Sequence, residues 1–233
     1  MLEVKGLNAA YGRAHILFDV DLKVDSGEVV VLLGRNGAGK STTLKALVGL
    51  VHPLSGSVTL DGTAIHRLKP FQIARLGLGY VPEDRRIFTD LSVRENLEVG
   101  RQAPRRGTAA WSLERLFGLF PNLAQLQDRP GGRISGGEQQ MLTIARTLMG
   151  NPSAILLDEP SEGLAPVIVE QMAKTIHELK REGLTVLLSE QNLHFAQAVA
   201  DRAYIIEKGH IRFCGTMADL SSNAALREQY LSV

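Results

Sequence analysis

The sequence contains one cysteine, few aromatic residues and almost no net charge. Because Cys214 is the only cysteine, no disulfide can form within the chain, which agrees with a reducing compartment. Aromatic residues make up 5% of the chain and the net charge is +1, so there is no large positive field to gather nucleic acid or anionic lipid. The arginine pairs Arg85-Arg86 and Arg105-Arg106 are local and typical of solvated faces. We therefore expect no nucleic acid among the partners.

Long apolar runs are scarce as well. The longest aliphatic runs, such as Val29 to Leu33, are far shorter than the roughly 18 to 20 residues that a membrane-spanning helix needs. The N-terminus carries Glu3 and no long apolar core of the kind found in a secretory signal. The 233 residues, 44% of them apolar, are enough for one or two ordinary globular domains. Any attachment to a membrane is therefore expected to come through partners.

A glycine-rich segment joins a buried-strand pattern to a helical pattern between Val29 and Thr42. Residues 34–41 fit G-x-x-x-x-G-K-[ST] at every fixed position, with the strand before and the helix after that this loop requires. Such a loop points successive N–H groups at a di- or triphosphate, while Lys40 adds a cation and Ser41 offers a hydroxyl to Mg²⁺. We predict that nucleotide is bound by Gly34, Asn36, Gly37, Gly39, Lys40, Ser41 and Thr42. A glycine turn without a ligand is the alternative, and the full match disfavours it.

The remaining patterns indicate an α/β protein. Alternating or fully apolar runs predict strands, and Asp61-Gly62 and Lys208-Gly209 predict hairpin turns. A strand, a helix that starts at Pro166, and another strand follow one another, which is typical of a parallel sheet. The predicted strands span residues 2–7, 18–25, 29–33, 57–60, 79–81, 154–157 and 185–188, with a hairpin over 203–215.

We therefore expect a P-loop NTPase core, a mostly parallel sheet flanked by helices, with an N-terminal antiparallel β subdomain. The stretch from Asp84 to about Gly150 reads as helical, with Ser92 and Glu95 as a capping box. The chain is accordingly predicted to be a single domain, in which residues 1–83 and 151–233 form the α/β core and residues 84–150 an inserted α-helical subdomain.

Two acidic residues, Asp158 and Glu159, directly follow the apolar strand at 154–157. In a parallel sheet this edge also carries the phosphate loop. Asp158 can hold Mg²⁺ through water, and Glu159 can orient or deprotonate the water that attacks the γ-phosphate. Solvated strand-end acids are the alternative, but together with the loop at 34–41 the pair favours nucleotide hydrolysis.

The segment from Ile134 to Gln140, ISGGEQQ, predicts a second phosphate-binding helix start. Ser135 can cap the following helix, whose buried face would be Met141, Ala145 and Leu148, and the two glycines allow close approach by an anion. Two separate phosphate sites in one chain suggest that two copies meet head to tail, each completing the nucleotide site of the other. Standing alone, the segment would be a glycine-loosened helix start.

In these motifs and their order the chain resembles the ATP-binding cassette ATPases, the subunits that power transporters of that name. The resemblance implies ATP and Mg²⁺ as ligands, residues 134–140 as the signature sequence, and Glu159 as the catalytic carboxylate with Asp158 on the Mg²⁺ side. It implies that Tyr11 stacks on adenine, for which ordinary packing is the alternative. The predicted nucleotide-binding residues of the signature are Ser135, Gly136, Gly137 and Glu138.

Three positions depart from the usual pattern of that family. Glu83 stands where a Gln generally senses Mg²⁺ and the membrane subunit, so we assign it to the metal with Ser41 and Asp158. Ala165 replaces an Asp, and Gln191 takes the switch position in which a His commonly contacts the γ-phosphate. Because Gln cannot carry a proton, we expect catalysis at this site to be slower than with His.

The sequences YVPE, DRRIF, SEGLAP and SEQN are similar to those of the ATPase subunits of bacterial branched-chain amino acid importers, with related urea importers sharing much of the pattern. The resemblance implies a second cassette ATPase, two transmembrane permease subunits and a periplasmic solute-binding protein as partners, at the cytoplasmic face of the inner membrane. The segment from Asp84 to Glu95 would receive the permeases, with Phe88 and Leu91 as apolar anchors. A soluble cassette ATPase acting on DNA or ribosomes, and a regulatory subunit that barely hydrolyses, are the two rival classes.

Overall fold

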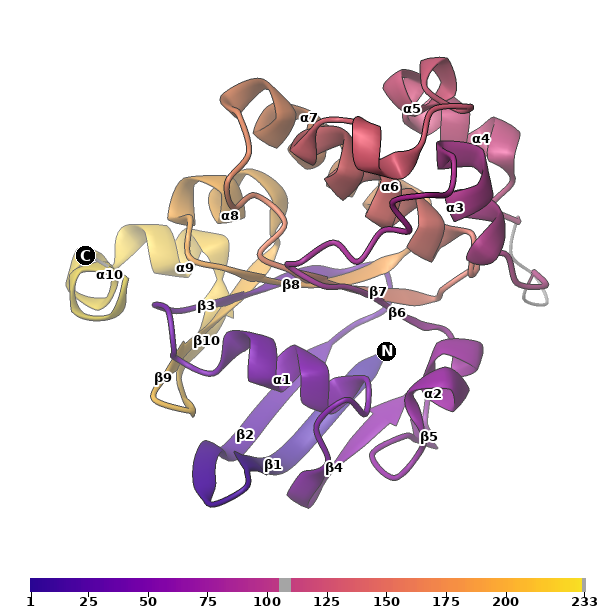
Figure 1. The fold of residues 1–233 in the computed structure, drawn as a ribbon. Helices are drawn as coiled ribbons and strands as arrows, with labels where there is room; N and C mark the ends of the chain where they lie inside the picture. Colours follow the sequence, from indigo (N-terminus) through magenta and orange to yellow (C-terminus); the bar gives the residue numbers. More distant parts are fainter. Residues whose placement is uncertain (105–109, 232–233) are drawn as a thin grey trace.

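The computed structural model describes residues 1–104 and 110–231, and two β-sheets with helices packed between and above them make up the fold (Figure 1). Arg105 and Arg106 lie outside the described residues. The four-stranded sheet is antiparallel and has the order β2-β1-β4-β5. Its strands are β1 Leu2–Tyr11, β2 Ala14–Val24, β4 Pro53–Leu60 and β5 Thr63–Ala64.

The six-stranded sheet has the order β10-β9-β3-β8-β7-β6 and is parallel except for its edge strand β10. Its strands are β3 Val29–Leu33, β6 Leu78–Val81, β7 Ala154–Asp158, β8 Thr185–Glu190, β9 Arg202–Glu207 and β10 His210–Thr216. Because β3, β7 and β8 are adjacent and parallel, the loops that follow their carboxyl ends meet at one edge of the sheet.

Helices cover both faces of the six-stranded sheet (Figure 1). On the face toward the antiparallel sheet lie α1 Lys40–Leu47 and α2 Pro70–Leu76. The opposite face carries α3 Val93–Val99, α4 Leu113–Leu119, α5 Pro121–Gln125, η1 Gly131–Arg133, α6 Gly136–Leu148, α7 Pro166–Arg181 and α8 Leu193–Val199. The chain ends in α9 Met217–Ser222 and α10 Ala224–Tyr230. Over residues 1–104 and 110–231, no helix combines the length and the apolar character needed to cross a bilayer.

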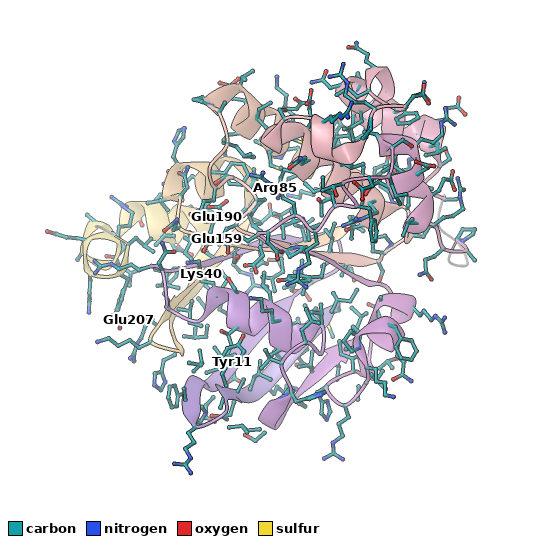
Figure 2. The ribbon with its side chains drawn as sticks, viewed as in Figure 1. Tyr11, Lys40, Arg85, Glu159, Glu190 and Glu207 are labelled. Atoms are coloured by element: carbon teal, nitrogen blue, oxygen red, sulfur yellow. The ribbon has the colours of Figure 1, made fainter. Side chains whose placement is uncertain are left out.

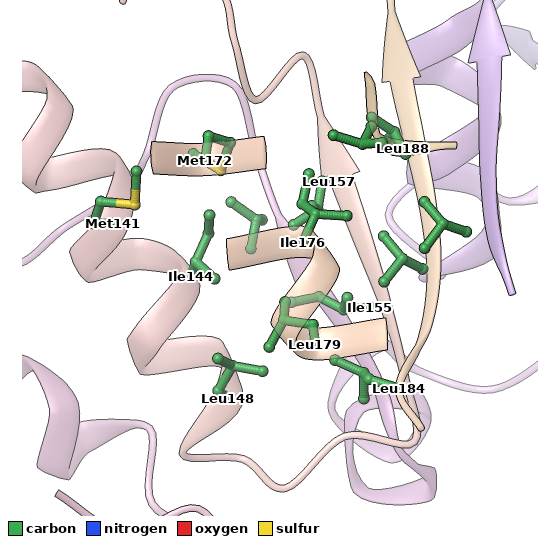
Figure 3. Close-up of a cluster of buried hydrophobic side chains, with 14 of the residues drawn as sticks. Met141, Ile144, Leu148, Ile155, Leu157, Met172, Ile176, Leu179, Leu184 and Leu188 are labelled. Carbon is green, nitrogen blue, oxygen red and sulfur yellow. The ribbon is translucent and has the colours of Figure 1, made fainter. Parts of the chain in front are cut away.

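The core consists of two apolar clusters separated by the six-stranded sheet. Along β3, Val29, Val31 and Leu33 belong to the cluster under α6, α7 and α8, whereas Val30 and Leu32 belong to the cluster shared with α1 and the antiparallel sheet. This alternation explains why β3 is apolar at every position: both of its faces are covered. Figure 3 shows the first cluster, in which Met141 and Ile144 of α6 and Met172 of α7 pack toward Leu157 of β7.

The α/β class, the antiparallel N-terminal sheet, the parallel core and the hairpin at Lys208-Gly209 are confirmed, and so are the capping box that starts α3 and the Ser135 cap of α6. The prediction that helical structure begins at Asp84 was wrong. Arg85 and Arg86 have φ of 60° and 47°, a left-handed conformation that no helix accommodates, and α3 starts only after the Ser92 cap. Neither of the helices α2 and α8 was predicted from the sequence.

Candidate nucleotide site

The phosphate loop connects β3 to α1 and depends on glycine where it approaches the neighbouring strand. A Cβ on Gly34 would lie 2.5 Å from the carbonyl oxygen of Ile206, and Gly39 has φ of 114°. Neither position accepts a side chain without strain. The loop folds around its own lysine, because the Nζ of Lys40 donates to the carbonyl oxygens of Gly34 at 2.8 Å and of Arg35 at 3.2 Å.

Lys40 and Glu159, predicted from separate motifs, are in direct contact. Their Nζ and Oε1 atoms are 3.0 Å apart, and both side chains are buried. Figure 2 shows Lys40, Glu159 and Glu190 at the same end of the six-stranded sheet. Glu159 has φ of 46°, a left-handed conformation at the turn after β7. The predicted phosphate-binding cation and the candidate water-activating carboxylate therefore lie side by side.

A cavity of about 430 Å³ surrounds this ion pair. Besides Lys40 and Glu159 it is lined by Ile16, Asn36, Gly37, Gly39, Ser41, Thr42, Glu83 and Glu162. Most of the residues predicted from the phosphate loop thus line one cavity together with Glu83, which comes from the segment after β6. Ile16 and Glu162 were not predicted. Glu162 could have been noticed as the acidic residue three positions after Glu159, whereas Ile16 gives no sequence signal.

Asp158, the candidate Mg²⁺-side acid, is buried and held by two hydroxyl groups. Its Oδ2 accepts a hydrogen bond from Tyr80 at 2.9 Å, and its Oδ1 accepts one from Ser189 at 2.7 Å. Burial and the adjacent Asp158 carboxylate raise the pKa of Tyr80 above its ordinary value, so Tyr80 is a hydrogen-bond donor here. The Ser189 hydroxyl also accepts the N–H of Glu159 at 3.0 Å. Tyr80 and Ser189 thus orient the Asp158 carboxylate, and Ser189 also holds the backbone of Glu159. The sequence analysis did not predict these two contacts because the hydroxyls come from other strands.

Glu162 and Glu159 interact as a pair of acids. Their hydrogen bond raises the pKa of Glu162 to about 7, with smaller contributions from burial and from the charges of Glu159, Glu83 and Glu190. Burial by itself would raise the pKa of Glu159, but hydrogen bonds from Glu162 and Lys40 outweigh it and lower the pKa. Below about pH 7 the shared proton is therefore held mainly on Glu162, while Glu159 stays ionised.

Some predicted residues lie away from this cavity. Tyr11 ends β1 with its side chain half-exposed, below Lys40 in Figure 2, and does not line the cavity. Gln191 is exposed just after β8 and does not line it either.

The signature residues form the start of α6, also outside the cavity. The side chain of Ser135 accepts the N–H of Glu138 at 3.3 Å, and the side chain of Glu138 accepts the N–H of Ser135 at 2.6 Å. Gly136 leaves room for Arg85, whose Nη1 would lie 2.8 Å from a Cβ at that position, and Gly137 leaves room for Ile168 of α7. The cap leaves Ser135 and the following glycines at the surface or half-buried.

Fold and cavity together define a P-loop ATPase in which a lysine and a carboxylate meet at the carboxyl edge of a parallel sheet. Residues 17–162 match the ABC transporter family. The chain belongs to this family, and as one of its ATPases it binds ATP.

Three relatives are similar over nearly the whole chain. The high-affinity branched-chain amino acid transport ATP-binding protein BraG of Pseudomonas aeruginosa is 43% identical, with 99% of each chain covered. A probable branched-chain amino acid transport ATP-binding protein LivF of Archaeoglobus fulgidus is 37% identical, with 94% of each covered. The lipopolysaccharide export system ATP-binding protein LptB of Escherichia coli K12 is 38% identical, covering 99% of this chain and 96% of that protein.

Solved structures show the same fold. The ATP-binding subunit of an ABC transporter superimposes with a TM-score of 0.84 at 31% identity, over 97% of this chain and 94% of that chain. The ADP conformation of the ATP-binding cassette MJ1267 superimposes with a TM-score of 0.83 at 26% identity, over 98% and 97%. The predicted family, fold class and ATPase activity are therefore confirmed.

Proposed function

We propose that this chain hydrolyses ATP to drive the uptake of branched-chain amino acids by a bacterial importer. The observation that carries the proposal is the meeting of Lys40, Ser41 and Glu159 in one cavity. Lys40 would bind the outer phosphates, and Glu159 would orient and deprotonate the attacking water. The 43% identity to BraG supports branched-chain amino acids as the solute.

Mg²⁺ is the metal that this site would take. Ser41 and Glu83, whose side chains carry oxygen atoms, line the cavity, and Asp158, which precedes the cavity-lining Glu159, is held by Tyr80 and Ser189. Oxygen ligands from one or two carboxylates and a hydroxyl, completed by phosphate and water, are what Mg²⁺ prefers. Bound there, Mg²⁺ would neutralise charge that develops on the phosphates during hydrolysis.

The chain would work as one half of a pair of cassettes. The start of α6, with Ser135, Gly136, Gly137 and Glu138, would bind the nucleotide held by a second ABC ATPase. Tyr11 would stack on adenine, since its ring is exposed at the end of β1. In this arrangement residues 1–83 and 151–233 act as the nucleotide-binding core and residues 84–150 as the helical subdomain.

An apolar groove of about 450 Å³ is the surface where we place a permease helix. It runs between α2 and β6 on one side and α3 and α6 on the other, and the exposed side chains of Leu50, Phe88 and Val99 line it. Arg146 lies over the Phe88 ring, 5.1 Å from its centre. Phe88 therefore fits the predicted anchor role, whereas Leu91 does not line the groove.

This surface would hold the chain at the cytoplasmic face of the inner membrane, peripherally, through two transmembrane permease subunits. A periplasmic solute-binding protein would select the solute on the other side. The urea importers remain the second candidate, and the 38% identity to the lipopolysaccharide export protein LptB supports an export assembly as a third.

A pull-down of the tagged chain from its native membranes in gentle detergent, followed by mass spectrometry, tests the proposal. We expect two polytopic membrane proteins and a second cassette ATPase, and the accompanying binding protein can then be titrated with leucine and urea. Phe88→Ser should lose the membrane proteins, whereas Leu54→Ser, which changes another exposed apolar side chain that does not line the groove, should retain them. Recovery of lipopolysaccharide export proteins, of ribosomes or of no membrane protein would overturn the importer assignment.

A further inference from the structure

Glu190, the last residue of β8, is hydrogen-bonded to three loops around the nucleotide cavity. Its carbonyl oxygen accepts the N–H of Gly34 in the phosphate loop at 3.3 Å. Its Oε1 accepts the N–H of Ser161, two residues after Glu159, at 3.1 Å. Its Oε2 accepts the N–H groups of Gln191 and Asn192, each at 3.2 Å. A single residue therefore connects the phosphate loop, the loop at 160–165 and the switch-position loop.

The Glu190 side chain is 1% exposed and does not line the nucleotide cavity. Burial raises its pKa, while the hydrogen bonds from Ser161 and Asn192 favour the ionised form and oppose that rise. Only a carboxylate has two acceptor oxygens for donors on two sides. A glutamine amide would turn an NH₂ group toward one of the loops and leave N–H facing N–H. The arrangement therefore requires glutamate for a reason separate from contact with nucleotide.

We propose that Glu190 is a positioning residue that couples Gln191 to the loop after the catalytic Glu159. This inference rests on the roles proposed above for Gln191 and Glu159. When a γ-phosphate engages Gln191, the backbone of Gln191 shifts, and its hydrogen bond to Oε2 of Glu190 moves the Glu190 carboxylate. The hydrogen bond between Oε1 of Glu190 and the N–H of Ser161 then shifts the loop at 160–165. The next residue, Glu162, reaches the cavity, so the presence of the γ-phosphate is transmitted to the acids that activate water.

Steady-state hydrolysis of MgATP by the purified complex that contains the full chain is the first test, with Glu190→Gln as the variant. We expect kcat to fall about tenfold or more while KM for ATP changes less than about threefold, because the phosphate loop is retained but the acids are misplaced. The matched control is Glu207→Gln, a strand-end glutamate on β9 that lies apart from Glu190 in Figure 2 and pairs with Arg212. Equal losses in kcat and in ATP affinity would indicate general damage and overturn the proposal.

A double-mutant cycle separates coupling from simple loss of activity. If Gln191 acts through Glu190, Gln191→Ala should reduce kcat in the wild-type chain but have little further effect in Glu190→Gln. Effects that multiply independently would overturn the coupling. Should the assembled complex hydrolyse no ATP at all, the proposed function fails, and the coupling is then judged from amide exchange.

Amide hydrogen exchange of the wild-type chain needs no variant. On addition of a non-hydrolysable ATP analogue, we expect the amides of Ser161, Gln191 and Asn192 to gain protection together. Protection of the switch-position loop without a change at Ser161 would overturn the proposal, even if Glu190→Gln cannot be purified in folded form.

Discussion

The ammonium group of Lys40 and the carboxylate of Glu159 form a buried ion pair, with Nζ and Oε1 3.0 Å apart. Lys40 also donates to the carbonyl oxygens of Gly34 and Arg35, so its hydrogen bonds are directed to the protein itself. A nucleotide phosphate that binds Lys40 must compete with Glu159 for the same ammonium group. Binding of ATP would thereby release the Glu159 carboxylate for the attacking water.

Glu159→Gln should therefore separate binding from hydrolysis. The variant removes the competing charge, so we expect ATP affinity to be retained or increased, while turnover falls at least about 100-fold because the water loses its base. Equilibrium binding of labelled ATP and phosphate release on the purified complex measure the two effects, with Glu207→Gln as the control. Unchanged turnover would show that hydrolysis takes place only at the site of a partner cassette.

Gln191→His tests whether the switch position limits the rate. Histidine can carry a proton and a positive charge near the γ-phosphate, whereas glutamine donates one neutral hydrogen bond. We expect turnover of the assembled complex to rise by about half to one order of magnitude, which is the effect expected from changing a single polar contact. Gln197→His, which changes an exposed residue of α8, is the matched control. An unaltered rate in Gln191→His would count against a slow site in this chain.

The fold was predictable where one physical signal dominated. Both faces of β3 are covered, so its run of Val and Leu marked a central strand, and the Ser92 and Ser135 caps marked helix starts with Glu three residues later. The stretch at 84–92 was misjudged because its polar residues carry no periodic signal for the left-handed backbone at Arg85 and Arg86. The short helices α2 and α8 have only seven residues each, too few for a helical period to stand out.

The sequence motifs of the site were predictable, but the residues that hold the motifs in place were not. The contiguous loop at 34–41 and the adjacent acids Asp158 and Glu159 have fixed local spacing. Tyr80 and Ser189 reach Asp158 from β6 and β8, at separations of 78 and 31 residues. Such contacts depend on strand order, which no local pattern in the sequence specifies.

Glu162 should make stability depend on pH near neutrality. Its pKa is raised to about 7, so the folded chain holds this proton more tightly than the unfolded chain. The resulting stabilisation is fully present below the ordinary glutamate pKa and is lost as pH rises through about 7.

Glu162→Gln keeps the neutral form at every pH. The melting temperature of the variant relative to wild type should therefore increase by about 2 °C between acidic and mildly alkaline buffer, a modest effect because the side chain is exposed. Calorimetry across this range measures it, and Glu170→Gln, an exposed glutamate of α7, should show no such trend. A constant difference at all pH values would refute the shared proton.

The two sides of α7 offer a matched test of the core. Met172 is fully buried between α6 and the six-stranded sheet (Figure 3), whereas Val167 at the start of the same helix is 68% exposed. Truncating a buried methionine removes its burial and leaves a cavity, so Met172→Ala should lower the free energy of unfolding by about 2 to 5 kcal/mol.

Val167→Ala should change the free energy of unfolding by no more than about 0.5 kcal/mol, because the side chain gains little from folding. Urea unfolding followed by circular dichroism gives both values from the midpoint and slope. If Met172→Ala lost no more stability than Val167→Ala, α7 could not be packed against the sheet as described. The loop at 160–165 would then lack the fixed helix that follows it, and Glu162 would lose the support that holds it at the nucleotide cavity.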